Sequence, residues 1–288
     1  MYSFLQNIIG DLNVQKKMKL YIVTEALFHT SFLISKVMGS SHIQSHFNIQ
    51  FIIQDKKELN KSELDSAHSL THTSLELQIK ALNEAYKGLS LAEIELCNSQ
   101  EIPTKHCLSE RNVKVTNDLN SDEIKGELNQ YKGSKCAMIF LDCILSPWWI
   151  SAFNNKIINA HSAVLPHARG MFAIEQYILT ANKENFQKAV GASIHYVDKG
   201  IDTGSLIKTC QLDNIWELDS IAQIKAKSYL LAFDMLINYA CKNEPFSLTD
   251  SYAQEYIGPI FFAKNYTSEV MQQSVNKFNE LKSEELVC

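Results

Sequence analysis

Arginine is almost absent from this 288-residue chain, and only Arg111 and Arg169 stand among its 27 basic residues. With 32 acidic residues, the formal net charge is −5, which disfavours general binding of nucleic acid. This net charge is compatible with a local basic patch. No run approaches the roughly 18 apolar residues that a membrane span needs. Residues 1–13 lack the uninterrupted apolar segment of a secretory signal. We therefore expect a cytoplasmic protein with no membrane span and no nucleic-acid partner.

The chain also lacks any Cys-x-x-Cys pair, and its seven cysteines are an odd number. Free thiols in a reducing compartment therefore fit better than a disulfide framework or a zinc site built on thiolates. The composition is 45% hydrophobic and 20% charged, which is ordinary for a globular protein with a core. The length predicts one large domain, or one domain with an appendage.

Strand-like and helix-like segments alternate along most of the chain, which predicts α/β layers. We predict strands at residues 19–24, 47–53, 136–141, 157–159 and 191–197, and helices at residues 25–38, 121–132, 170–182 and 222–240. The strand at 136–141 is wholly apolar, as in a parallel sheet that is buried on both faces. The polar stretch at 62–96 has helical periodicity and is read as an insertion between strands. Residues 243–288 have a weaker pattern.

Two polar clusters interrupt the apolar background, at residues 157–170 and 194–204. Moving an acyl group between nitrogens requires hydrogen-bond donors for an oxyanion and an acid/base pair for the protons. Asn159 offers an amide donor, and His161, two residues along the same strand, points to the same face. Asp202, in a turn-rich loop, can orient the imidazole and help to take the proton of the amine. The two clusters therefore predict acyl-transfer chemistry.

These clusters resemble a known family. The pattern Asn-x-His, Leu-Pro, Arg-Gly, then His-aromatic-Val and Asp-x-Gly is similar to the folate-dependent formyltransferases, closely over residues 136–212 and loosely over 19–135. That family includes glycinamide ribonucleotide transformylase, methionyl-tRNA formyltransferase and the sugar N-formyltransferases. The resemblance implies a Rossmann-like, mostly parallel sheet with helices on both faces, here with a helical C-terminal extension. It also implies 10-formyltetrahydrofolate as the formyl donor, no metal, and Asn159, His161 and Asp202 as the catalytic trio.

The resemblance also implies two backbone-rich loops for the folate, and the sequence pattern predicts a division of the chain. The folate contacts would be Leu141, Cys143, Ile144 and Leu145 in the first loop, and Val197, Asp198 and Gly200 in the second. The division is a leader at 1–18, a catalytic domain at 19–215 with a helical insertion at about 60–100, and a helical extension at 216–288.

The turn after the first strand departs from the branch of the family that binds ribonucleotides. A glycine-rich turn cradles phosphate there, whereas this chain has Glu25 and no glycine. We therefore expect an acceptor without a phosphate at that turn, with Glu25 holding a cationic group instead. Arg169 and Gly170 either contact the acceptor or brace their loop. The closest branch formylates small amines or hydroxylamines, such as ornithine-type side chains in secondary metabolism, and the nucleotide-sugar branch stays open.

Several alternatives compete with this interpretation. His161, His195 and Asp202 can ligate a metal, but no third imidazole or thiolate has suitable spacing. His195 fits better as a structural strand histidine near Asp202. A hydrolase of the same family would release formate to water, but such enzymes add an N-terminal regulatory domain that residues 1–18 are too short to form. A non-catalytic binding module is the last alternative, and the presence of the whole trio argues against it.

Overall fold

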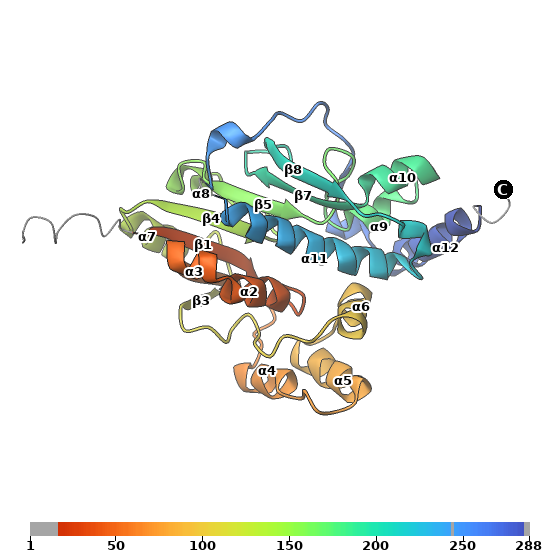
Figure 1. Cartoon of the computed structure of the whole chain (residues 1–288), viewed down its shortest axis with the longest axis horizontal. Helices are drawn as coiled ribbons and strands as arrows, with labels where there is room; N and C mark the ends of the chain where they lie inside the picture. The colour runs from red at the N-terminus through yellow and green to blue at the C-terminus, as the bar shows by residue number, and fades with distance from the viewer. Residues whose placement is uncertain (1–16, 243–244, 285–288) are drawn as a thin grey trace, which may run out of the picture.

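A seven-stranded sheet runs through the molecule, with helices packed on both of its faces (Figure 1). The computed structural model describes residues 17–242 and 245–284, so the predicted leader lies almost entirely outside the described residues. The strands lie in the order β3-β2-β1-β4-β5-β7-β8. Their bounds are β1 Met18–Glu25, β2 Phe47–Gln54, β3 Val113–Thr116, β4 Lys135–Phe140, β5 Ile157–His161, β7 Gly191–Tyr196 and β8 Leu206–Gln211. The first five of these run parallel to one another, β7 runs antiparallel to β5, and β8 runs antiparallel to β7.

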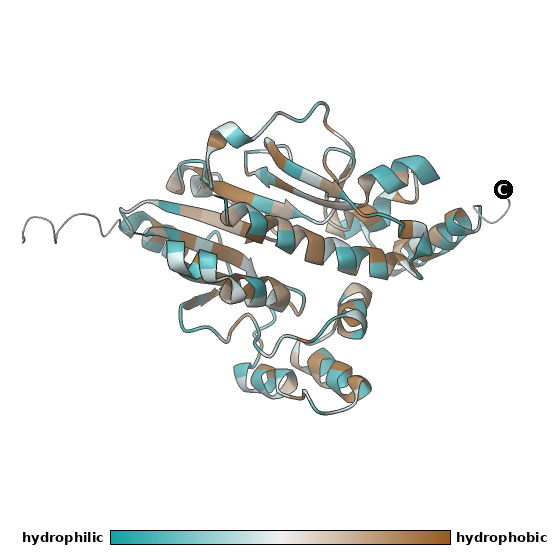
Figure 2. Ribbon diagram, in the orientation of Figure 1, coloured by the Kyte–Doolittle hydropathy of each residue, from teal (hydrophilic) through white to brown (hydrophobic). Residues whose placement is uncertain are grey.

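Alternation along β1 shows why both faces of the sheet are covered. Leu20 and Ile22 are buried on one face, whereas Tyr21 and Val23 are buried on the other, as the two-residue period of a strand requires. The first face packs against α2 (Thr30–Gly39) and α11 (Ile221–Ala240), and the second against α7 (Asp122–Gln130) and α8 (Trp148–Ala152). Hydrophobic residues accordingly follow the strands, whereas α2 and α11 carry both hydrophobic and hydrophilic residues (Figure 2). The α/β fold predicted from the sequence is confirmed.

Three helices occupy the polar stretch between β2 and β3: α4 (Lys61–His68), α5 (Leu75–Ala85) and α6 (Leu91–Ser99). They lie below the sheet in the view of Figure 1, and a shorter helix, α3 (Ser41–His46), precedes β2. Two buried polar contacts attach this insertion to the turn after β1 and to α2. Glu93 accepts a hydrogen bond from the backbone N–H of His29, and the Tyr86 hydroxyl lies 2.9 Å from that of Ser31. The insertion is therefore anchored to the sheet domain through α2.

Two predicted helices differ from the structure. The predicted helix at 170–182 is divided into β6 (Arg169–Gly170), α9 (Ala173–Tyr177) and, further on, α10 (Lys183–Ala189). Left-handed backbone at Phe172, with φ of 51°, separates β6 from α9. The helix predicted at 25–38 begins only at Thr30, after an irregular turn. The strands β3 and β8 were not predicted.

The C-terminal region is more ordered than its sequence pattern predicted. It contains a helix, α12 (Ser268–Ser283), whose Phe278 stacks on Trp216 at a ring distance of 5.8 Å. It also contains a short strand, β9 (Ile260–Phe261), that pairs in parallel with β6. Three short 3-10 helices complete the described elements: η1 Ile215–Glu217, η2 Leu248–Asp250 and η3 Ala263–Asn265. None of the described helices is both long and apolar enough to cross a membrane.

The strand order places a binding crevice at one edge of the sheet. The chain builds β2 and β3 on one side of β1 and then returns to build β4 and β5 on the other side. In open α/β sheets, ligands bind outside the carboxyl ends of the strands at such a reversal of order. That edge carries the ends of β1, β4 and β5, at Glu25, Phe140 and His161.

Candidate active site

A cavity of about 260 Å³ opens at the carboxyl ends of β4 and β5. Its walls are formed by the ends of β4 and β5, the loops that follow β4 and β7, the paired β6 and β9 with the residues after them, and part of α11. The lining residues are Ile139–Leu145, Pro147, Ile150, Asn159–Ser162, Gly170–Phe172, His195, Val197–Asp202, Lys225, Tyr229, Phe261 and Phe262. All three predicted catalytic residues are among them, as are all seven predicted folate contacts and Gly170.

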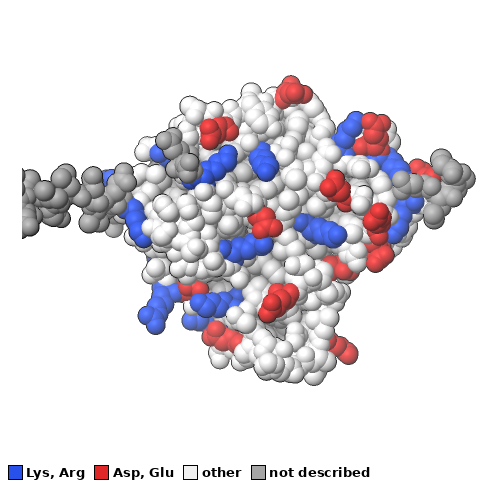
Figure 3. Space-filling model, in the orientation of Figure 1, with Lys and Arg blue, Asp and Glu red and all other residues white. Residues whose placement is uncertain are grey.

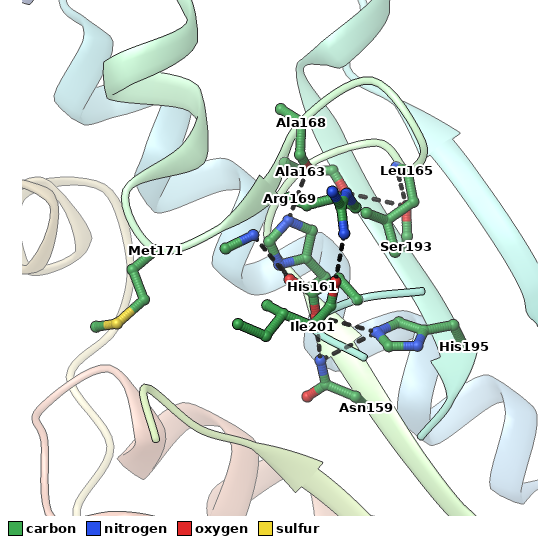
Figure 4. A network of polar contacts seen from close by, with 12 residues as sticks. Asn159, His161, Ala163, Leu165, Ala168, Arg169, Met171, Ser193, His195 and Ile201 are labelled. Atoms are coloured by element: carbon green, nitrogen blue, oxygen red, sulfur yellow. Dashed lines mark hydrogen bonds and ion pairs between the residues drawn. The ribbon is translucent and has the colours of Figure 1, made fainter. Parts of the chain in front are cut away.

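Asn159 and His195 face one another across the β5–β7 pair (Figure 4). The Nδ1 atom of His195 lies 2.9 Å from the carbonyl oxygen of Tyr196, a contact that only an N–H can make. In the neutral ring, the Nε2 atom is then the acceptor for the Asn159 amide, 3.1 Å away. The same amide nitrogen lies 3.3 Å from Oδ1 of Asp202. His195 thus fixes the direction in which Asn159 presents its N–H groups.

His161 lies at the end of β5 and is buried. Its Nε2 atom donates to the carbonyl oxygen of Ala168 at 3.0 Å, so Nδ1 carries the free lone pair. Nδ1 lies 3.7 Å from Oδ2 of Asp202. Burial lowers the pKa of His161 below its ordinary value of 6.5, and the nearby Asp202 carboxylate opposes that shift. The imidazole is therefore neutral at neutral pH and can accept a proton at Nδ1.

Asp202 connects the site. Its Oδ2 accepts from the backbone N–H of Gly170 at 2.8 Å, and its Oδ1 lies 3.4 Å from His195. Burial alone would raise the pKa of this carboxyl group, but the neighbouring His161 and His195 and the Gly170 N–H hold it well below its usual range. The residue adopts left-handed backbone, with φ of 52°. The sheet and loops thus bring together the three side chains that the sequence predicted to be catalytic.

The loops around the trio are held by side chains behind it. The Ser193 hydroxyl bridges the Ala163 carbonyl at 2.9 Å and the Leu165 N–H at 2.8 Å, which fixes the turn after β5. Arg169 is buried and donates to the carbonyl oxygens of Ile201, at 2.9 Å, and Gly258, at 3.0 Å. Arg169 does not line the cavity; of its two suggested roles, these contacts are those of a brace.

Glu25 also lies outside the cavity lining. Its Oε2 atom accepts from the backbone N–H of Asp142 at 2.9 Å, and its Oε1 atom lies 3.4 Å from the Lys56 ammonium. Burial and the nearby Asp142 raise the pKa of Glu25. Both carboxylate oxygens are therefore occupied, one of them by the first predicted folate loop.

The lining suits a flat heterocycle with polar edges. Side chains of Ile139, Phe140, Leu141 and Leu145 supply apolar surface. The backbone N–H and C=O groups of Leu141 and Cys143 have no hydrogen-bond partner within the described residues. Such groups can read the amide edge of a pterin, so these residues fit the folate that the sequence predicted. In the described part of the chain, no group of three or more His, Cys, Asp or Glu residues is arranged to hold a metal ion.

The sequence missed part of the cavity wall. Phe172, Lys225, Tyr229, Phe261 and Phe262 all line it. The two phenylalanines at 261 and 262 reach the site because β9 pairs with β6, a long-range contact with no local sequence signal. Lys225 carried a usable signal, because it stands between Ile224 and Ala226 on the buried side of α11, where a charge is unusual.

Comparison with known proteins agrees with this geometry. A family model described as "Formyl transferase" matches residues 47–235, more than half of the chain. The chain therefore belongs to the formyl transferase family.

Individual relatives match over shorter segments or at low identity. A methionyl-tRNA formyltransferase of Finegoldia magna is 28% identical over 104 residues, which are 35% of this chain and 32% of that protein. A phosphoribosylglycinamide formyltransferase of Bacillus subtilis is 36% identical over 76 residues, 26% and 36% of the two chains. The matches span about a third of these curated relatives. An N-formyltransferase of Helicobacter canadensis, solved with folinic acid and dTDP-3-aminofucose, shares the fold at a TM-score of 0.54 and 12% identity, over 91% of this chain and 80% of that one.

Proposed function

We propose that this protein transfers a formyl group from 10-formyltetrahydrofolate to a primary amine or N-hydroxylamine of a small molecule. The observation that carries the proposal is the meeting of Asn159, His161 and Asp202 in one cavity, beside two loops suited to a folate. The folate supplies an activated formyl group on nitrogen. Membership of the formyl transferase family supports the same chemistry.

Each member of the trio has a role that follows from its geometry. His161 is held neutral with Nδ1 unprotonated, so it can take the proton that the amine loses and later return it to the departing nitrogen. Asp202, ionised and 3.7 Å from Nδ1, stabilises the imidazolium while it exists. The Asn159 amide can donate to the carbonyl oxygen as negative charge develops on it. Its present bond to Asp202, at 3.3 Å, is long and easily exchanged for a stronger acceptor.

The acceptor has two candidate classes. The first is a small amine or hydroxylamine such as an ornithine side chain, which is suggested by the missing glycine-rich turn after β1. The second is a nucleotide-linked amino sugar. It is supported by the fold shared over most of both chains with the Helicobacter canadensis enzyme, which was solved with such a compound. Both classes present to the same trio a nucleophilic nitrogen that carries a hydrogen.

The test incubates the purified protein with the donor and each member of a panel of amines. The release of tetrahydrofolate is measured by its absorbance. We expect release to require an amine, with ornithine, N-hydroxyornithine and nucleotide-linked amino sugars as the first compounds. Release at the full rate without amine, together with formate, would identify a hydrolase instead. Binding of the folate without any release would identify a non-catalytic module.

A further inference from the structure

Lys225 is a buried cation at the cavity that no step of the proposed reaction uses. It lies on α11 at 6% exposure and lines the cavity with Tyr229, one turn further along the helix. Both its neighbours in sequence, Ile224 and Ala226, are buried apolar residues. Burying an ammonium group is costly unless partners compensate for the lost water.

The partners that the structure provides are incomplete. Within the described residues, the ammonium has one ionic partner, Oε2 of Glu175 at 3.5 Å, which is longer than a charge-assisted hydrogen bond. Glu175 is itself 7% exposed, and its Oε2 has no hydrogen-bond partner. The ring of Tyr229, centred 5.3 Å from Nζ, adds a cation–π contact. An ammonium has three N–H donors, so its capacity for hydrogen bonds is left unfilled.

The surroundings hold this wall of the cavity in place. The Tyr229 ring stacks on His29 at 4.3 Å, and His29 Nδ1 lies 2.9 Å from Oε1 of Glu93 on α6. Glu93 is buried, and although burial alone would raise its pKa, the contacts with His29 lower it to about 2. Because Glu93 is thus ionised and hydrogen-bonded, the insertion fixes the position of Tyr229 beside Lys225.

We propose that Lys225 binds an anionic group of the acceptor, so that the acceptor carries a carboxylate or a phosphate as well as its amine. The inference rests on the proposed function for the identity of the bound molecule. An anion there would fill the donors that Glu175 leaves free. The Lys225 charge also contributes to lowering the pKa of His161, so the ammonium lies within electrostatic range of the reacting end. The carboxylate of an amino acid and the phosphate of a nucleotide-linked sugar share this chemistry.

The experiment compares matched amines with and without the anion. Binding to the full chain in the presence of tetrahydrofolate is measured by calorimetry for ornithine against putrescine, and for a nucleotide-linked amino sugar against the free amino sugar. In one of the two pairs, we expect the anionic member to bind about tenfold to a hundredfold more tightly, the scale of a charge-assisted hydrogen bond. The pair that shows the preference identifies the source of the anion.

Variants of α11 test whether Lys225 causes the preference for the anionic amine. Lys225→Met should abolish it, whereas Lys225→Arg and the exposed control Lys227→Met should retain it. If Lys225→Met fails to fold because Glu175 is left unpaired, the double variant Lys225→Met/Glu175→Gln removes both charges and should lose the same preference. The inference would be overturned if the wild type did not prefer the anionic amine, or if the variants that lack Lys225 kept that preference. It would also be overturned if these variants bound both members of a pair equally more weakly. Tight binding of the anionic amine without formyl transfer would overturn the proposed function and leave the inference intact.

Discussion

The side chain on which the proposed mechanism depends most is His161. Its Nε2 is committed to the Ala168 carbonyl, and its Nδ1 faces the Asp202 carboxylate. The two largest effects on its pKa oppose one another: burial, the larger, lowers it and Asp202 raises it. The structure therefore places a neutral imidazole beside an ionised carboxylate at neutral pH.

The first prediction concerns the protonation of this histidine. The His161 titration, followed by NMR of its ring protons, should have its midpoint below the ordinary value of 6.5. Asp202→Asn removes the carboxylate that raises the pKa, so the midpoint should move to still lower pH. A midpoint at or above 6.5 in the wild type, or one that rises in Asp202→Asn, would contradict the described electrostatics.

The second prediction separates two roles for Glu25. Its contact with the Asp142 N–H indicates that Glu25 positions the first folate loop. Glu25→Ala should therefore raise KM for the folate roughly tenfold, the cost of one hydrogen bond to a charged group, and leave KM for the amine unchanged. Glu25→Gln keeps an acceptor oxygen and should have the smaller effect. The reverse pattern, with only KM for the amine raised, would instead support the role in binding a cationic group of the acceptor that the sequence predicted.

At the scale of elements, the C-terminal segment at residues 252–262 packs against the loop that carries Asp202. Tyr252 forms a bridge with Leu206, and the Gln254 amide donates to the carbonyl oxygens of Asp202, at 2.8 Å, and Gly204, at 3.0 Å. Further on, Gly258 accepts from Arg169. This segment therefore belongs to the site, although the sequence assigned it to a separate extension.

The third prediction tests the contacts of Gln254 with the loop that carries Asp202. The left-handed backbone of Asp202 costs of the order of 1–3 kcal/mol and needs surrounding contacts to persist. Gln254→Ala removes two of them and should lower kcat about tenfold, with KM for the folate unchanged and the circular dichroism spectrum retained. Gln273→Ala, at an exposed position on α12, is the matched control. A loss of thermal stability with kcat unchanged would show that Gln254 is only structural.

What the sequence predicted at this scale follows from local signals. Asn159 and His161 are two positions apart on an apolar strand, so the sequence predicts that their side chains share one face of the sheet. The period of the strands also predicts the layers of the fold. The pairing of β9 with β6 depends on residues about ninety positions apart and leaves no mark in either segment. The sequence did not predict the irregular backbone before α9, because Phe172 adopts left-handed backbone there and, unlike a glycine, is not a residue type that indicates it. Lys225 was not singled out from the sequence, and its ion pair with Glu175, on another helix, leaves no local signal.

At the scale of the whole molecule, distant parts of the chain enclose one cavity. Strand β5 supplies Asn159 and His161, and the loop between β7 and β8 supplies Asp202. Helix α11 and the C-terminal segment supply a wall, and the insertion holds Tyr229 through His29. On the face shown in Figure 3, basic and acidic side chains are interspersed, without a continuous basic surface on that side. The features that point to chemistry therefore gather at the cavity between the strand ends and α11.

The central claim is that the trio moves a formyl group onto an amine. Its most direct test is mass spectrometry of the acceptor after incubation with 10-formyltetrahydrofolate labelled in the formyl carbon. We predict a product in which one amine hydrogen is replaced by the labelled formyl group. His161→Ala and Asp202→Ala should each lower the rate by about two to four decades with the fold retained, the scale for loss of an acid/base group. Label recovered only as formate, or full formylation by a folded His161→Ala variant, would contradict the account.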